Sequence, residues 1–327
     1  MAGGRPEDRP RFLGRPGFLR RRGVLAALQI LAAAVVIAFL AYGVRGSWDE
    51  ALPRLRHARP LDLVVACAVL AAYYLLFVLG WLWILRALRV HTTYRVALQA
   101  EMVSMLAKYV PGGVWTPAAR VLAMRRAGIV DTPVILASIG LEAALSAISG
   151  IAVFVAGLAW VEDADAPLVP LFLLAAVLLV ILHPRVFTRL GTRLFRLFGS
   201  SVVPLLPLRV MLGLLVFYAS SWIVGGVALL FLLRAVGGDP DLTSIPFLGG
   251  TAAVGAIVAV LSVFAPSGLG VREASMYGLL LAVVSDAVAL GATVLNRLAI
   301  TLVEALLLAV GAIASRLTAR PASEPPS

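Results

Sequence analysis

The chain has 327 residues, of which 61% are hydrophobic and 14% are charged. Soluble domains hold roughly 45–50% apolar residues, so this composition excludes a soluble globular protein and indicates an integral membrane protein. The net charge of +11 does not indicate nucleic-acid binding, because the arginines cluster beside apolar runs in the pattern of membrane orientation signals.

The apolar runs predict an all-α polytopic fold, because each run approaches or exceeds the roughly 20 residues that span a bilayer. We expect one transmembrane domain over 23–315, between a basic arm (1–22) and a short polar tail (316–327). The basic flanks place both termini in the cytoplasm. Full crossings are expected at 24–44, 61–85, 131–158, 167–183, 210–232 and 289–314, and a basic surface helix at 186–208.

Two further apolar segments are interrupted by proline and glycine. The first, 94–120, breaks at Pro111-Gly112-Gly113, and the second, 245–286, breaks at Pro266-Ser267-Gly268-Leu269-Gly270. Backbone N–H and C=O groups that lose their helical hydrogen bonds are tolerated in a membrane only where protein or water supplies new partners. Two interrupted apolar segments, one in each half of the chain, therefore indicate a transporter's binding site. Basic residues on both flanks predict that the first segment enters the membrane from the cytoplasm. The acidic flank at Asp286 predicts that the second segment enters from outside. Segments that enter from opposite sides are expected in an inverted repeat. The alternative for 245–286 is two full crossings of the membrane.

Lys108 is the only lysine among 28 basic residues, and it abuts the first break. A lysine ammonium binds phosphate well, whereas the alternative is a lysine whose ammonium extends to the interface. Glu101 lies on the same helix face at helical spacing. If a helix restarts after Gly113, the free backbone amides at its start favour an anion. Pro117 suits the first turn of that helix, and Arg120 lies one turn beyond it. Trp115 suits either a lipid chain or an interfacial aromatic belt.

Charged residues at membrane depth form a second group of candidates. Glu142 lies near the middle of 131–158, and we expect it to pair with Arg297, whose helix also bears Glu304. A purely structural ion pair is the alternative. After the second break, Arg272 is positioned to reach a phosphate, and Glu273 suits either the site or the first turn of a restarting helix.

Cys67 is the only cysteine, and the three histidines are scattered, so no disulfide, metal site or cofactor is expected. No Gly-x-x-x-x-Gly-Lys nucleotide loop is present, so any transport would run down a gradient or be coupled to ions. Glu142 and Glu304 are the candidates for a protonation step.

The stretches Lys108-Tyr109-Val110-Pro111-Gly112-Gly113-Val114-Trp115 and Pro266 to Glu273 resemble the lysylphosphatidylglycerol synthase transmembrane-region family, over about residues 20 to 315. The resemblance implies a multi-pass plasma-membrane protein that moves a lipid or a lipid-linked carrier between leaflets. The two breaks and the side chains next to them predict the substrate site, which comprises Lys108, Tyr109, Pro111, Gly112, Gly113, Trp115, Arg120, Pro266, Gly268, Gly270, Arg272 and Glu273. The soluble synthase domain of the fused members is not expected.

The leading hypothesis is a non-enzymatic flippase for an anionic or phosphate-bearing lipid, with the phosphate between the two breaks. The alternatives are a membrane-embedded transferase that uses a lipid-linked donor, with Glu142 or Glu273 as base, and a non-transporting partner of envelope glycosyltransferases. A transferase would need a convergent acid and base, which the sequence does not show. Transport in liposomes distinguishes the three.

Overall fold

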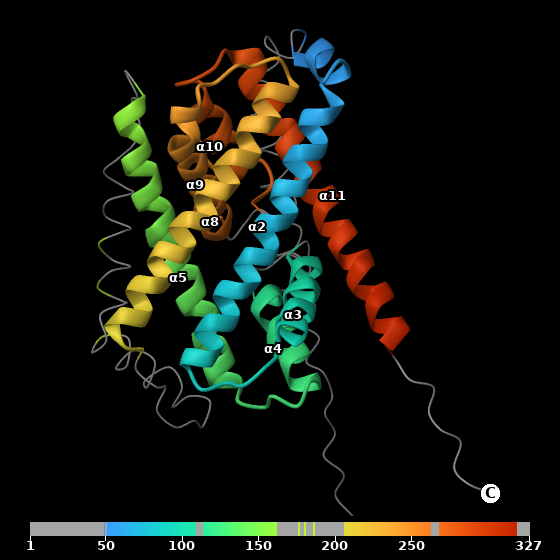
Figure 1. The fold of residues 1–327 in the computed structure, drawn as a ribbon, viewed down its shortest axis with the longest axis vertical. Coiled ribbons are helices and arrows are strands. Elements are labelled where there is room, and N and C mark those ends of the chain that lie inside the picture. The colour runs from blue at the N-terminus through green and yellow to red at the C-terminus, as the bar shows by residue number, and fades with distance from the viewer. Residues whose placement is uncertain are drawn as a thin grey trace, which may run out of the picture.

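The computed structural model describes residues 49, 51–108, 114–161, 206–262 and 268–318, with isolated positions 176, 180 and 186. The ordered elements in this part of the chain are helical (Figure 1). They are α2 (Pro60–Ala87), α3 (Tyr94–Ala107), α4 (Trp115–Arg126), α5 (Thr132–Gly157), η1 (Leu158–Trp160), α8 (Leu208–Ala235), η2 (Leu242–Ser244), α9 (Ile245–Leu261), α10 (Val271–Leu280) and α11 (Asp286–Thr318).

The predicted all-α membrane fold is confirmed. Within the described residues, five helical segments are long and apolar enough to cross a bilayer: α2, α5, α8, η2 with α9, and α11. Their limits follow local chemistry. The Asp131 carboxylate accepts a hydrogen bond from the Val134 amide and caps α5, and Thr93 caps α3 through the Val96 amide.

Both predicted breaks separate two helices that pack side by side, α3 with α4 and α9 with α10. We call these pairs hairpin 1 and hairpin 2. With only 10 residues, or about 15 Å of helix, α10 is too short for the ~30 Å hydrocarbon layer. The alternative of two full crossings within 245–286 is therefore wrong.

The described helices form two units of the same order, a long helix, a hairpin and a second long helix. The first unit is α2–α5 and the second is α8–α11. Figure 1 shows hairpin 1 in the lower half of the molecule and hairpin 2 in the upper half. The long helices also run in opposite directions, since α2 descends where α8 ascends. This is the geometry of an inverted repeat.

Hairpin 2 is held tightly against the long helices by glycines. A Cβ on Gly250 of α9 would collide with the Phe154 backbone of α5, and a Cβ on Gly226 of α8 would collide with Gly249. Small residues let membrane helices approach closely and gain van der Waals contact where no hydrophobic effect drives them together. The result is a rigid α5–α8–α9 core beside hairpin 1.

The two ends of the bundle differ in their balance of charge. The lower end in Figure 1, where α2 ends and α4 ends, is mainly basic. The upper end is mixed, because acidic residues next to hairpin 2 lie there together with Arg54, Arg56, Arg59 and Arg234. The lower set includes Arg86, Arg89, Arg95, Arg125 and Arg126, and the upper set includes Asp239, Asp241 and Asp286.

Several predictions lie outside the described residues. These are the basic arm 1–22, the helices 24–44 and 167–183, most of the surface helix 186–208, and the end of the tail. Among the candidate site residues they are Tyr109, Pro111, Gly112, Gly113 and Pro266.

Candidate functional site

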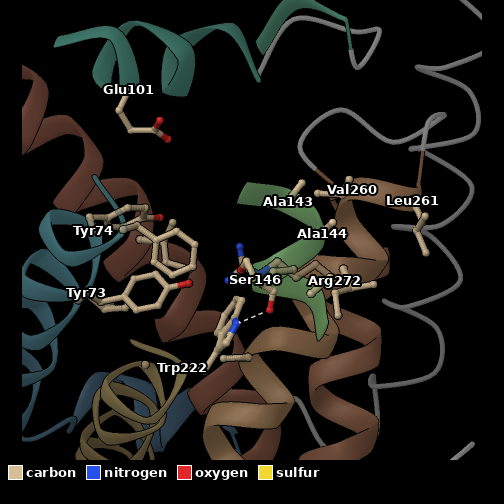
Figure 2. Close-up of a pocket in the computed structure, with 18 of the residues that line it drawn as sticks. Tyr73, Tyr74, Glu101, Ala143, Ala144, Ser146, Trp222, Val260, Leu261 and Arg272 are labelled. Atoms are coloured by element: carbon tan, nitrogen blue, oxygen red, sulfur yellow. Dashed lines mark hydrogen bonds between the residues drawn. The ribbon is translucent and has the colours of Figure 1, made fainter. Parts of the chain in front are cut away.

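A cavity of about 610 Å³ lies between the two hairpins and the long helices (Figure 2). Glu101 of hairpin 1 and Arg272 of hairpin 2 both line it, together with residues from α2, α5, α8, α9 and α11. The other lining groups are mainly alanines, aliphatic side chains and aromatic rings. It therefore has the character of a small-molecule site, an apolar volume with a few polar groups.

Aromatic rings form one wall of this cavity. Tyr73 packs on Phe77 at 4.7 Å between ring centroids, and Trp222 of α8 lies 5.7 Å from each. The Trp222 indole donates a 2.9 Å hydrogen bond to the Ser146 carbonyl of α5, which fixes the ring across the bundle. Figure 2 shows Tyr73 and Tyr74 on the side of the cavity opposite Ala143 and Val260.

Arg120 of hairpin 1 holds two carboxylates. Its guanidinium pairs with Glu101 of α3 and with Glu142 of α5, and all three side chains are largely buried. The Trp81 ring lies 4.4 Å from the guanidinium carbon, in a cation–π arrangement. The Trp81 indole in turn donates to Ser138 at 2.9 Å. This network ties hairpin 1 to α2 and α5.

Lys108, at the end of α3, pairs with Glu304 of α11. Tyr74 of α2 donates a 2.7 Å hydrogen bond to the same carboxylate oxygen. Glu304 is almost fully buried, with 2% of its surface exposed, so a cation and a donor compensate its burial. Lys108 therefore links hairpin 1 to the second repeat unit.

In hairpin 2, Glu273 has a capping role. Its carboxylate accepts a 2.7 Å hydrogen bond from the Gly270 amide at the start of α10, and it lies 3.5 Å from the Arg297 guanidinium. Gly270 has φ +85°, and Gly268 has φ +65° with its Cα against Ala259, so both positions require glycine. The sequence reading of Glu273 as a helix-start residue is confirmed.

Arg272 differs from the other basic residues around the cavity. No described carboxylate forms an ion pair with it, and its Nε is buried with no hydrogen-bond partner in the described part of the chain. Its aliphatic stem lies beside Gly255 of α9, where a Cβ would come within 3.4 Å of the Arg272 Cγ. Arg272 therefore brings to the cavity lining a positive charge that no described carboxylate compensates.

The predicted pair between Glu142 and Arg297 is wrong. Glu142 pairs with Arg120, and Arg297 pairs with Glu273. The reason is the hairpin geometry: α4 turns back beside α5, so Arg120 meets Glu142 within the first unit. Equivalent positions of an inverted repeat are related by symmetry, and that relation does not bring them into contact.

Most of the described candidates do gather around the cavity. Glu101 and Arg272 line it, and Lys108, Arg120, Glu142 and Glu304 form ion pairs around it. Trp115 lies instead at the start of α4 with 44% of its surface exposed. The aromatic wall, Asn296 and the α5 alanines were not predicted. No group of three or more His, Cys, Asp or Glu that could hold a metal occurs among the residues described.

Comparison with known proteins bears on this geometry. The family model for the lysylphosphatidylglycerol synthase TM region matches residues 26–308, which include both hairpins and all the residues around the cavity. A search of the curated proteins finds no match to the chain. Because the family model covers most of the chain, the protein belongs to the lysylphosphatidylglycerol synthase transmembrane-region family.

Proposed function

We propose that this protein moves a phosphate-bearing lipid between the leaflets of the plasma membrane, with the headgroup in the central cavity and its phosphate on Arg272. The observation that supports this most strongly is Arg272 itself, a guanidinium that lines a membrane-embedded cavity without a carboxylate partner among the described residues. Ionisable groups inside a membrane are costly and are usually retained for function. A lipid phosphate would supply the negative charge that Arg272 lacks among the described residues.

The chemistry of arginine suits this role. Its planar guanidinium binds phosphate through two parallel hydrogen bonds, which gives geometric specificity as well as charge. The cavity volume of about 610 Å³ falls within the ~300–1,000 Å³ typical of small-molecule sites, so it suits a headgroup while the hydrocarbon chains stay in lipid.

The other cations around the cavity contribute differently. Lys108, Arg120 and Arg297 each hold at least one carboxylate. We therefore assign the phosphate to Arg272 in place of Lys108, and we assign Lys108 and Arg120 to holding hairpin 1 in position. Arg297 supports Glu273 at the start of α10.

Transport also explains the architecture better than catalysis or scaffolding does. Opposed hairpins that meet at a central cavity are the arrangement of secondary transporters, which bind substrate near the bilayer centre. A scaffold would not need an uncompensated arginine in that cavity. In this proposal the protein is not an enzyme, and the basic lower end of the bundle faces the cytoplasm, as do both termini.

Reconstitution tests the proposal. The purified chain is placed in vesicles with fluorescent phosphatidylglycerol, a fluorescent polyprenyl phosphate or a fluorescent neutral glycolipid, and quenching of outer-leaflet dye reports movement. We expect faster movement of at least one phosphate-bearing lipid than in protein-free vesicles, and no acceleration of the glycolipid. Equal acceleration of the neutral lipid, or no acceleration of any lipid, would contradict the proposal.

A further inference from the structure

We infer that the hydrocarbon chains of the transported lipid leave the cavity sideways, through an opening between α5 and the C-terminal end of α9. We call this opening the α5–α9 portal; Gly140, Ala143, Val260 and Leu261 line it. The inference rests on the proposed function and adds to it the place where the substrate enters from the bilayer.

The two helices that form the portal, α5 and α9, pack closely above it and separate at it. Higher in the bundle, Gly150 of α5 meets Ala253 of α9 so closely that a Cβ would collide. Towards the end of α9, cavity-lining residues of both helices become exposed: Val260 is 77% exposed, Leu261 is 61% exposed, and Gly140 and Ala143 are exposed on the facing helix. The cavity therefore reaches the outer surface of the described structure at this place.

On the α5 side of the portal, the lining residues have no large side chain that could fill the opening. A Cβ added at Gly140 would meet no atom within 4 Å, which shows open space in front of this glycine. Ala143 and Ala147 follow at helical spacing and also line the cavity. Figure 2 shows Ala143 and Val260 on neighbouring helices at the same end of the cavity as Arg272.

The apolar lining of the portal favours a hydrocarbon chain over a polar headgroup. Its four lining residues are glycine, alanine, valine and leucine, which offer no hydrogen bond to a headgroup and suit a hydrocarbon chain. Arg272 lies on the same side of the cavity, so a lipid phosphate bound there has its chains directed to the portal. Gly140 lies eight residues into α5, about 12 Å from its end, so the chains emerge into the bilayer core.

The corresponding pair of helices in the inverted repeat is joined by an ion pair. In the inverted repeat, α11 corresponds to α5 and α3 corresponds to α9. There, Lys108 at the end of α3 pairs with Glu304 of α11, and Tyr74 hydrogen-bonds the same carboxylate. The two interfaces therefore differ in chemistry: an ion pair joins α3 to α11, whereas α5 and α9 present small and aliphatic side chains to the cavity.

Two tryptophan substitutions test the portal. Gly140→Trp fills the opening, and Gly278→Trp on α10 is the matched control, because a Cβ there also meets nothing within 4 Å. In vesicles with fluorescent phosphatidylglycerol, we expect Gly140→Trp to slow lipid movement by about tenfold or more. Gly278→Trp should stay within about twofold of wild type. Equal rates for the two folded variants would overturn the portal while leaving the proposed function in place; a wild-type protein that moves no lipid would remove both.

A second measurement uses the unmodified protein and does not depend on a variant that folds. Wild type in vesicles is irradiated with phosphatidylglycerol that carries a photoreactive group on its acyl chain, and the labelled peptides are identified by mass spectrometry. We expect labelling within 140–147 and 256–261 that excess unlabelled lipid suppresses. Labelling spread evenly over all lipid-facing helices would overturn the inference.

Discussion

Replacing Arg120 by leucine should destabilise the protein severely, because one guanidinium compensates two buried carboxylates. The exposed fraction of each of the three side chains is at most 18%, so neither Glu101 nor Glu142 can regain full hydration. Removing one partner of a buried ion pair typically costs ~3–5 kcal/mol, and here two carboxylates lose their cation together. The loss of the cation–π contact with Trp81 adds ~1–2 kcal/mol. We expect a loss of at least ~3 kcal/mol in the free energy of unfolding.

Unfolding in mixed micelles, followed by tryptophan fluorescence as the denaturing detergent is increased, measures this loss. The matched control is Arg125→Leu, which removes an exposed arginine from the same helix and should cost less than ~0.5 kcal/mol. Adding Glu142→Gln to Arg120→Leu should restore at least ~1 kcal/mol, since it removes one uncompensated charge. The reasoning is refuted if Arg120→Leu costs no more than Arg125→Leu, or if Glu142→Gln worsens it.

Three further predictions follow from other parts of the molecule. Lys108→Ala should lower the free energy of unfolding by ~1–3 kcal/mol, because the buried Glu304 carboxylate loses the Lys108 cation. Lys108→Arg should recover most of this loss in the same micelle assay, and equal stability of wild type and the alanine variant would count against the link to α11. Gly250→Leu should prevent close packing of α9 on α5 and lower the yield of folded protein in size-exclusion chromatography, whereas Gly311→Leu, which meets open space, should not; normal yield for Gly250→Leu would show that α9 can shift. A reporter enzyme that works only outside the cytoplasm should be inactive when fused after residue 327, and activity there would reverse the proposed orientation.

The breaks in the apolar pattern were enough to predict the two hairpins. Proline and glycine disrupt helices through local chemistry, so Pro111 and Pro266 could be interpreted without knowledge of tertiary contacts. The signs of the flanking charges then predicted that the hairpins enter from opposite sides, which is their arrangement in Figure 1. The long helices were predicted to within a few residues at most ends for the same reason.

The partners of the buried charges could not be predicted in this way. Glu142 and Arg297 occupy equivalent places in the two units, but pairing depends on which helix turns back beside which, and that is a tertiary property. The aromatic wall was missed for a different reason. In a membrane helix that is apolar on every face, the sequence does not distinguish the face that lines a cavity from the face that meets lipid. Tyr73 and Phe77 at i, i+4 spacing were the available signal.

The central claim is that Arg272 binds the lipid phosphate, and the most direct test is the transport rate of Arg272→Gln. Equal amounts of folded wild type, Arg272→Gln and Arg234→Gln are compared in vesicles that contain the fluorescent phosphate-bearing lipid that wild type moves. Arg234→Gln is the control because it removes an arginine at the end of α8, away from the cavity. A charge-assisted hydrogen bond is worth ~1.5–3 kcal/mol, so we predict a roughly ten- to hundredfold slower rate for Arg272→Gln and a near-normal rate for Arg234→Gln. A wild-type rate in the Arg272→Gln protein would contradict the account.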